Sequence, residues 1–430
     1  MSWLLIKNGR LIDPSQKKDE ITDILIHDGK VEAIRPMVPH PKEGVEVIDA
    51  TGLVVTPGWV DMHTHLREPG GSHKETIKTG TEAAAAGGFT SIACMANTNP
   101  VNDNSFITTY LNQRIKAESQ INVHCIGAIT KGLAGEELAE IGGMREAGAV
   151  GISDDGVTVM NAYLMRKAFD YSKRFDVPVI THAEDCHLKG KGVMNEGFNS
   201  ARLGLRGIPK VSEEIIVARD ILLANLTGAR LHVAHVSTKG SVELIRVAKR
   251  QGVRITAEVT PHHLTLTDEA VGNYDTNTKV APPLREPQDV EAVQEGLADG
   301  TLDALATDHA PHSVEEKQVE YDLAAFGMVG LETAFALYHR LVLNQVVSLD
   351  RVIEAMTIRP AEILGIPRGS LKIGAVADVT IFNAATKYTI DKTEFRSKSM
   401  NTPFHGWQVQ GKVFYTIVNG TTIYRAKEAV

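Results

Sequence analysis

Cysteine is scarce in this chain, which has only three among its 430 residues. Cys94, Cys125 and Cys186 are scattered and odd in number, which excludes a disulfide framework and a zinc site built on cysteine. This usage is typical of a reducing compartment, so we expect a cytoplasmic protein. No uninterrupted run of about 18 apolar residues occurs, so no transmembrane helix is expected. Residues 1–10 also lack the pattern of a signal peptide.

Long basic clusters are also missing: the longest is Lys189-Gly190-Lys191, which is expected to be a solvated loop, and the formal net charge is −8. No stripe of lysine and arginine of the kind that binds nucleic acid occurs, and neither low-complexity tracts nor solenoid repeats are present. A negative overall field repels an anionic substrate, so local cations would have to bind one. The composition, 43% hydrophobic and 23% charged, is that of an ordinary globular protein with a large and a smaller domain.

Short β-branched runs alternate with longer segments of helical periodicity between about residues 54 and 347. Eight runs are expected to be strands: 54–63, 90–95, 122–128, 150–153, 178–182, 230–235, 254–259 and 304–307. Eight segments are expected to be helices: 77–86, 105–117, 136–147, 162–175, 212–223, 241–251, 289–297 and 331–343. Successive strand-then-helix units predict an α/β fold, a closed parallel (β/α)8 barrel of the TIM type.

The two ends of the chain have a different pattern. Short strands are expected at residues 4–6, 24–26, 31–34, 379–382, 413–418 and 422–424. Turns are expected at Asp28-Gly29 and Asn419-Gly420. Neither end has enough strands for a stable sheet alone. We therefore predict that residues 1–56 and 367–430 form one small composite β-sandwich beside a barrel of residues 57–366.

Histidine and aspartate residues lie at the ends of the predicted barrel strands, where barrel enzymes have their active sites. His63 and His65 close the first strand, and alternate residues of a strand point to the same side, so both imidazoles can reach one ion. Further candidates follow the fourth, fifth, sixth and eighth strands: Asp154, Asp155, His182, His235 and Asp308. A lone histidine at a strand end is usually structural, but this convergence predicts a binuclear metal site. Imidazole and carboxylate ligands without thiolate suit zinc, with manganese or cobalt as substitutes.

Several motifs resemble those of the dihydroorotases in the amidohydrolase superfamily. Residues 61–70 (DMHTHLREPG) and 307–312 (TDHAPH) are similar to two signatures of that family. The likeness continues through residues 95–100 (MANTNP), 153–156 (SDDG) and 260–264 (TPHHL), so it covers nearly the whole chain. An HxH pair alone is a weak signal, whereas this ordered set is specific. The resemblance implies a zinc-dependent enzyme that reversibly hydrolyses the cyclic amide of dihydroorotate to N-carbamoyl-L-aspartate in pyrimidine biosynthesis.

The resemblance also implies two zinc ions per chain. It assigns three ligands to the first ion and two to the second: His63, His65 and Asp308, then His182 and His235. Hydantoinases bridge their ions with a carboxylated lysine after the fourth strand, but residues 150–160 contain no lysine. An aspartate can bridge with its two oxygens, and Asp155 is our choice by its spacing from the other motifs. Asp154 is the alternative.

By the same resemblance, the metal lowers the pKa of a bound water to about 7 and supplies a hydroxide that attacks the ring carbonyl. Asp308 is expected to accept the proton of that hydroxide and to pass it to the departing ring nitrogen. Arg67 offers a two-pronged donor for the exocyclic carboxylate of the substrate. The other substrate contacts that the resemblance implies are His65, Asn97, Ala281, His312, Phe326 and Gly327.

Ala281 departs from the family pattern. Family members often read KxNPPLR where residues 279–285 read KVAPPLR. Alanine cannot supply the side-chain amide that asparagine would offer the substrate ring, so a backbone contact or the nearby Asn277 would have to substitute. His262 and His263 are expected to support the ligands or the fold, since both metal positions are already filled.

Other functions stay open on sequence alone. Allantoinase and hydantoinase-like enzymes use the same barrel, although the missing lysine argues against a hydantoinase and Arg67 favours an anionic substrate. A catalytically inactive structural subunit would usually lose some ligands, and all six positions are present here. The resemblance implies a homodimer. Some dihydroorotases also dock onto aspartate carbamoyltransferase, and this association stays open because the sequence contains no docking motif. The charge pattern and the lack of a long apolar run indicate no nucleic-acid or membrane partner. Residues 313–327 suit either a lid or an ordinary exposed loop.

Overall fold

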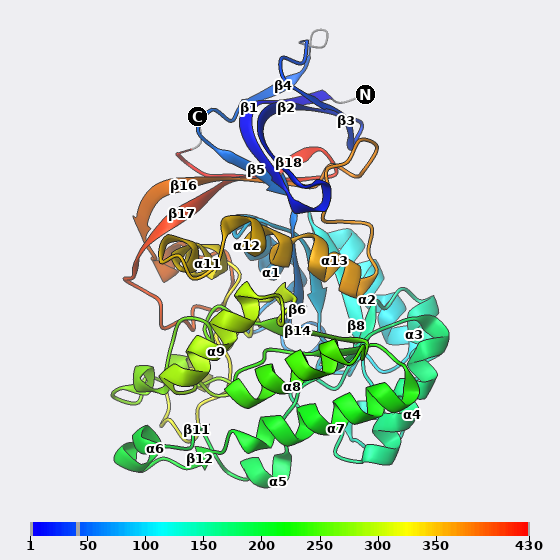
Figure 1. Ribbon diagram of the computed structural model, residues 1–430, viewed down its shortest axis with the longest axis vertical. Helices are drawn as coiled ribbons and strands as arrows, with labels where there is room; N and C mark the ends of the chain where they lie inside the picture. The colour runs from blue at the N-terminus through cyan, green and yellow to red at the C-terminus, as the bar shows by residue number, and fades with distance from the viewer. Residues whose placement is uncertain (1–2, 40–43, 429–430) are drawn as a thin grey trace.

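The computed structural model describes residues 3–39 and 44–428 and contains a barrel sheet and a second large sheet beside it (Figure 1). The barrel sheet has the order β15-β14-β13-β10-β9-β8-β7-β6. Its parallel strands are β6 (Trp59–Thr64), β7 (Phe89–Cys94), β8 (Asn122–Gly127), β9 (Gly151–Ser153), β10 (Val179–Thr181), β13 (Leu231–Val233), β14 (Ile255–Val259) and β15 (Ala304–Leu305). The chain beyond β15 closes the sheet, because the His65 amide donates to the His309 carbonyl oxygen at 2.9 Å. The predicted barrel is confirmed.

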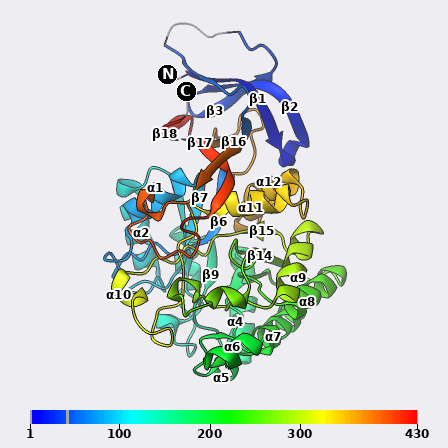
Figure 2. The same ribbon diagram turned by 90° about the vertical axis from the view of Figure 1, so that its left-hand side faces the viewer.

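Helices cover the outside of the barrel (Figures 1 and 2). They are α1 (Ile77–Ala86), α2 (Ser105–Glu118), α3 (Ile141–Glu146), α4 (Ala162–Ser172), α7 (Val211–Thr227), α8 (Lys239–Arg250), α9 (Pro287–Ala298), α11 (Ala334–Leu343), α12 (Leu349–Met356) and α13 (Ile358–Leu364). The sequence pattern explains their limits: the Thr238 hydroxyl accepts from the Ser241 amide and caps α8, and Gly228 ends α7 in a left-handed conformation. The helix predicted over residues 136–147 begins only at Ile141, because the residues before it form bends and an isolated bridge between Thr130 and Leu138.

The segment between β10 and α7 was not anticipated from the sequence. It carries α5 (Cys186–Lys189), β11 (Met194–Asn195), α6 (Phe198–Leu203) and β12 (Gly207–Ile208), and the two strands form their own small parallel sheet. Another short helix, α10 (Val314–Lys317), lies in the loop that follows β15. Both insertions lie at the carboxyl end of the barrel strands, where loops build binding sites.

The second large sheet joins the two ends of the chain. It consists of β1 (Trp3–Asp13), β2 (Lys18–His27), β3 (Lys30–Arg35), β4 (Glu46–Asp49), β5 (Val54–Pro57), β16 (Val379–Thr389), β17 (Gln408–Val418) and β18 (Thr421–Arg425). Its order is β18-β17-β16-β5-β1-β2-β3, with β4 on β1, and it has an apolar core of its own. The predicted turns are present, with positive φ at Asp28-Gly29 and at Asn419-Gly420. The prediction of a strand-rich unit built from both ends is confirmed.

The first barrel strand differs from its prediction. The apolar run over residues 54–63 is two strands, since β5 pairs with β16 and β1 in the end sheet and β6 pairs with β7 in the barrel. The break falls at Gly58, where a Cβ would lie 2.2 Å from the Thr90 hydroxyl oxygen. One apolar run conceals this junction, because strands buried in either sheet have the same composition.

The predicted domain limits, residues 1–56 with 367–430 and residues 57–366, stay a prediction. Residues 1–2, 40–43 and 429–430 of these ranges lie outside the described residues. Within residues 3–39 and 44–428, none of the helices combines the length and the apolar character that a membrane crossing requires.

Candidate metal and substrate site

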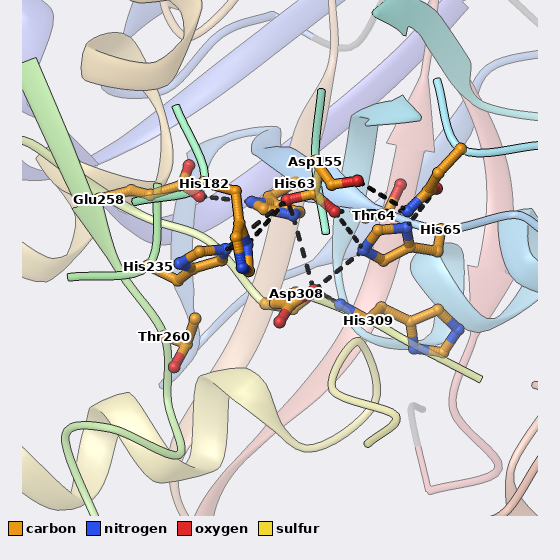
Figure 3. Close-up of polar contacts among 12 residues, drawn as sticks. His63, Thr64, His65, Asp155, His182, His235, Glu258, Thr260, Asp308 and His309 are labelled. Atoms are coloured by element: carbon orange, nitrogen blue, oxygen red, sulfur yellow. Dashed lines mark hydrogen bonds and ion pairs between the residues drawn. The ribbon is translucent and has the colours of Figure 1, made fainter. Parts of the chain in front are cut away.

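The six predicted metal ligands lie together at the carboxyl end of the barrel strands (Figure 3). They come from five strands or the residues directly after them: His63 and His65 at β6, Asp155 after β9, His182 after β10, His235 after β13 and Asp308 after β15. None of the six is more than 7% exposed. In the sequence each of these residues lies at the end of a strand or directly after it, and closure of the parallel sheet brings all six together.

Asp155 lies at the centre of this cluster. Its Oδ1 lies 3.3 Å from His63 Nε2 and 3.6 Å from both His182 Nδ1 and His235 Nε2. Its Oδ2 lies 3.4 Å from His65 Nε2. Two groups of potential ligand atoms share this carboxylate, one with His63 and His65 and the other with His182 and His235. A single aspartate therefore faces both groups.

Asp308 joins the His63 and His65 side of the cluster. Its Oδ1 lies 3.1 Å from His65 Nε2 and 3.6 Å from His63 Nε2. The backbone of Asp308 has φ +47° and that of His235 has φ +34°, in a region that residues with a side chain rarely adopt. Such strain costs about 1–3 kcal/mol and persists where the surrounding structure imposes it, commonly at functional sites.

The donor atoms fit a metal cation. His63 Nε2 and Asp155 Oδ1 are buried and have no hydrogen-bond partner among the described residues, although they face each other. A buried polar atom without a hydrogen-bond partner costs about 1–3 kcal/mol, so such atoms are rare in natural structures. A cation bound between these two atoms would remove that cost. Imidazole nitrogens and carboxylate oxygens without a thiolate are a donor set that zinc accepts.

The electrostatics of the cluster favour positive charge. Burial lowers the pKa of His63, but the negative charges of Asp155 and Glu258 outweigh burial and hold that pKa well above 6.5. Burial raises the pKa of Asp155, yet the charge of His63 and the nearby imidazoles of His182 and His235 hold that pKa well below 3.8. A metal cation satisfies the same carboxylates, so metal and protons compete for these side chains.

The structure turns Asp154, the alternative bridging residue, away from the cluster. Its Oδ1 accepts hydrogen bonds from the amides of Ile129 at 2.7 Å and Thr130 at 3.0 Å. Its Oδ2 accepts from the Thr130 hydroxyl. Both oxygens of Asp154 are thus used in holding the loop after β8, whereas Asp155 faces the histidines.

Glu258 is a part of the site that the sequence analysis missed. It lies on β14, is fully buried, and its Oε1 lies 2.7 Å from His63 Nδ1 while its Oε2 lies 3.2 Å from His232 Nε2. The contact orients the His63 ring so that Nε2 faces Asp155. Burial raises the pKa of Glu258, but the charge of His63 and hydrogen bonds from His232 and His63 lower it to about 2. A lone glutamate inside an apolar barrel strand was the available signal.

A cavity of about 190 Å³ opens on the cluster. Eleven of the twelve predicted metal and substrate residues line it: His65, Arg67, Asn97, Asp155, His182, His235, Ala281, Asp308, His312, Phe326 and Gly327. His63 is not among the lining residues. The cavity also includes Lys189 of α5, whose Nζ lies 2.5 Å from Glu184 Oε2 and 4.8 Å from the centre of the Phe326 ring. The basic cluster at residues 189–191 was expected to be a solvated loop, but its first lysine lines the cavity, because the insertion after β10 folds over the barrel mouth.

Arg67, His312, Phe326 and Gly327 form one side of the cavity, which we term the carboxylate wall. Arg67 Nε donates to the Pro311 carbonyl oxygen at 3.1 Å, and an Arg67 Nη lies 3.3 Å from His312 Nε2. That ring nitrogen lies 2.8 Å from the Phe326 carbonyl oxygen. Burial lowers the pKa of His312 to about 3, and the charge of Arg67 contributes, so the imidazole is neutral. Arg67 is the cation of this wall.

Of three residues that were considered for contacts with the substrate ring or carboxylate, Asn97 and Ala281 line the cavity and Asn277 does not. Asn97 lines the cavity, and its Oδ1 lies 2.9 Å from His65 Nδ1, so it holds a predicted metal ligand. Ala281 lines the cavity without a side-chain donor. The structure does not bring Asn277 to the cavity lining, since its side-chain amide donates to Asp275 Oδ1 at 3.0 Å.

His262 and His263 follow β14. His263 lies 2.8 Å from the Thr260 hydroxyl and 3.0 Å from the Pro282 carbonyl oxygen, so it fixes the turn that carries Ala281. His262 is buried, and neither of its ring nitrogens has a hydrogen-bond partner among the described residues. Neither histidine is in the two groups of potential ligands.

Fold and site together define a class, the metal-dependent amidohydrolase barrels. Residues 223–424 match the family model described as "Amidohydrolase family", and residues 52–241 match the one described as "Dihydro-orotase-like". A dihydroorotase of Pelotomaculum thermopropionicum is 55% identical over 421 residues, which cover 98% of each chain. A dihydroorotase of Geobacter metallireducens is 53% identical over 98% of this chain and 99% of that protein. This chain belongs to the dihydroorotase family, and that membership implies a metal.

Solved structures support the fold. The L-hydantoinase (dihydropyrimidinase) from Arthrobacter aurescens has a TM-score of 0.90 at 28% identity, over 100% of this chain and 98% of that one. A dihydropyrimidinase from Brevibacillus agri has a TM-score of 0.86 at 24% identity, over 100% of this chain and 96% of that one. Both structures have the same architecture as this chain, at much lower identity than the dihydroorotases.

Proposed function

We propose that this protein is a dihydroorotase, which reversibly hydrolyses the cyclic amide of (S)-dihydroorotate to N-carbamoyl-L-aspartate in the de novo synthesis of UMP. One observation carries the proposal: the cavity that opens on the His and Asp cluster is also lined by the guanidinium of Arg67. A cyclic amide with an attached carboxylate suits such a cavity. The relatives named dihydroorotase, 53% and 55% identical over almost the whole chain, support the same substrate.

The proposed metal centre would hold two zinc ions, with Asp155 shared between their ligand groups. The first ion would be bound by His63, His65 and Asp308, and the second by His182 and His235. The two ligand groups that share Asp155 support this arrangement. When bound, the zinc ions would polarise the amide carbonyl and lower the pKa of a water.

The residues of the chain would orient the substrate and move the proton. Arg67 would bind the exocyclic carboxylate, with His312 and Asn97 beside it, and backbone groups of Phe326-Gly327 would contact the ring. Asp308 lines the cavity and faces His65, so it is positioned to take a proton from the attacking water. The amide C–N bond then breaks, and Asp308 returns the proton to the departing ring nitrogen. Ring closure reverses these steps.

Zinc content and dihydroorotate hydrolysis, measured in parallel, test the metal centre. We expect two zinc ions per active wild-type chain, and loss of both metal and activity in Asp155→Ala. The matched control is Asp170→Ala, because Asp170 is exposed on α4. If Asp155→Ala keeps metal and activity while Asp154→Ala loses them, the bridge lies at Asp154. A metal-free, inactive wild type would contradict the proposal and favour a structural subunit.

The substrate is tested by a direct comparison of dihydroorotate and allantoin, because allantoin also has a ring amide. Turnover of dihydroorotate alone is expected, since allantoin lacks the carboxylate that Arg67 would bind. Turnover of allantoin alone would overturn the assignment. Hydantoin serves as a third substrate that separates dihydroorotase from hydantoinase activity.

The remaining proposals concern assembly and location. We expect a cytoplasmic homodimer that associates with aspartate carbamoyltransferase, and a mass near twice 46.7 kDa in light scattering would support the dimer. Co-elution with the purified transferase would support the association, and independent migration would count against it. The domain limits are tested by limited proteolysis, in which the first cut is expected near residue 367, which is exposed, because residues 53–66 are buried.

A further inference from the structure

A segment from the carboxyl-terminal part of the chain reaches the mouth of the barrel. Residues 395–402, which we term the crossing segment, lie between β16 and β17 of the end sheet, and in Figure 1 this orange-red stretch leaves the sheet and runs along the barrel. It contacts the loop that follows Arg67. Lys398 Nζ donates to the Ser72 carbonyl oxygen at 2.7 Å, and the Ser399 hydroxyl donates to the Lys74 carbonyl oxygen at 2.7 Å.

The same segment is joined to the loop that follows β15 through one side chain. The Asn401 amide nitrogen donates to the carbonyl oxygens of Ala310 and Gly327, both at 3.1 Å. Its Oδ1 accepts from the His312 backbone amide at 3.0 Å. The Asn401 backbone carbonyl oxygen accepts from the Val329 amide at 3.0 Å. Asn401 is only 5% exposed, so these bonds are not exchanged for water.

The partners of Asn401 belong to the cavity itself. Ala310, His312 and Gly327 all line it, and the His312 ring contacts Arg67. Asn401 joins the two ends of the loop over residues 310–327, one end at Ala310 and His312 and the other at Gly327. The side chain does not line the cavity, so any effect on substrate is transmitted through these backbone groups.

We propose that Asn401 is a positioning residue for the carboxylate wall, setting the distance between His312 and Gly327 from outside the barrel. This inference rests on the proposed function, because it assumes that the wall binds the substrate carboxylate. It assigns the end-sheet part of the chain a role in substrate affinity. Among the described residues, Asn401 forms no hydrogen bond with any of the proposed metal ligands, which lie on or beside the barrel strands.

Only a primary amide has the hydrogen-bonding groups that this position needs. Two carbonyl oxygens require two N–H donors, and one backbone amide requires an acceptor. Aspartate has almost the same shape, but it would place a carboxylate oxygen 3.1 Å from the carbonyl oxygens of Ala310 and Gly327. Alanine would leave the same three buried backbone groups without partners, without adding repulsion.

Steady-state kinetics of the zinc-loaded, full-length enzyme test the proposal with Asn401→Asp and Asn401→Ala. We expect KM for dihydroorotate to rise about 10- to 100-fold in both variants, with a smaller change in kcat and unchanged zinc content. The matched control is Asn225→Asp, because Asn225 is exposed on α7. A wild-type KM in either variant would overturn the inference. A fall in kcat together with zinc loss at unchanged KM would also overturn it, because that result would mean that Asn401 supports the metal ligands and not the wall.

Hydrogen exchange of the wild-type protein gives a test that does not depend on folding of a variant. The His312 amide should exchange slowly, because it donates to a buried Asn401 oxygen. Exchange at the rate of an open loop would overturn the proposal. A wild type that turns over no dihydroorotate would contradict the proposed function instead. In that case, orotate binding to the wild type and both variants tests the role of Asn401 separately. Weaker binding in both variants would support the inference, and equal binding would overturn it.

Discussion

The metal-ligand cluster and the carboxylate wall are adjacent, but they are built in different ways. The ligands lie on barrel strands or directly after them, and the sheet closes around Asp155. The wall is formed by loops, and residues 395–402 of the crossing segment hold two of those loops in place. The comparison shows that the ligand cluster is assembled mainly from strand ends, whereas the wall depends on contacts between distant parts of the chain.

The two regions also differ in charge. The cluster concentrates carboxylates and attracts cations, while the wall presents the single guanidinium of Arg67 in a protein of net charge −8. Because the overall field repels an anion, local cations have to supply the attraction. Mutations in the cluster should therefore change metal content, and mutations in the wall should change KM.

The largest effect in the wall is expected for Arg67→Met. This change removes the charge while it keeps much of the side-chain volume, so kcat/KM for dihydroorotate should fall about 30- to 1000-fold with unchanged zinc content. Steady-state kinetics and metal analysis check this result. Arg250→Met is the control, since Arg250 is exposed on α8. Loss of zinc in Arg67→Met would contradict the separation of the two regions.

Glu258→Gln tests the support of the cluster, because Glu258 contacts His63 on the side of the ring that faces away from Asp155. The glutamine cannot supply the negative charge that holds His63 Nδ1, so zinc affinity or activity should fall about 10- to 100-fold. Zinc competition with a chelator measures the change, and added zinc should restore much of the activity. Glu243→Gln is the control, because Glu243 is 57% exposed. A rise in KM without a change in zinc affinity would place Glu258 with the wall instead.

Gly327→Ala should raise KM about 10-fold. Gly327 has φ +133°, where a side chain is strained, and a Cβ there would lie 2.7 Å from the Ala310 Cβ. Gly132→Ala is the matched control, since Gly132 also has a positive φ and a Cβ there would meet nothing within 4 Å. Equal kinetic effects in the two variants would mean that strain alone, and not the wall, is responsible.

The smallest expected effect concerns pH and Lys317, a buried residue of the loop that carries the wall. Burial, with a contribution from the charge of Lys279, lowers the pKa of Lys317 from 10.5 to about 7. Between these values the unfolded chain binds a proton that the folded protein has lost, so this group makes the free energy of unfolding rise with pH. Lys317→Met should remove up to about 1.4 kcal/mol per pH unit of that slope.

Urea unfolding at several pH values above 7 measures the Lys317 effect. Lys167→Met is the control, because Lys167 is exposed on α4 and should leave the slope unchanged. Parallel pH curves for wild type and Lys317→Met would show that Lys317 stays charged in the folded protein. Its contacts with the carbonyl oxygens of Thr276 and Ala325 would then outweigh burial.

Much of the fold and of the cluster was predictable because both have local signals. Helix α1 begins and ends where the periodicity indicated, and the turns at Asp28-Gly29 and Asn419-Gly420 depend on residue types that accept positive φ. The junction at Gly58 was missed, because one apolar run supplies strands to two sheets. Glu258 was missed because its partner His63 is 195 residues away.

The sequence by itself determined the barrel, the ligand types and their order, since each strand end carries its own motif and parallel strands end at one rim. Only the tertiary structure decided that Asp155 faces the histidines while Asp154 binds the Ile129 and Thr130 amides. It also decided that Asn401 closes the loop over residues 310–327. The orientation of neighbouring side chains and the contacts between residues far apart in the chain depend on tertiary packing. Such packing produces no local periodic pattern that a single sequence could show.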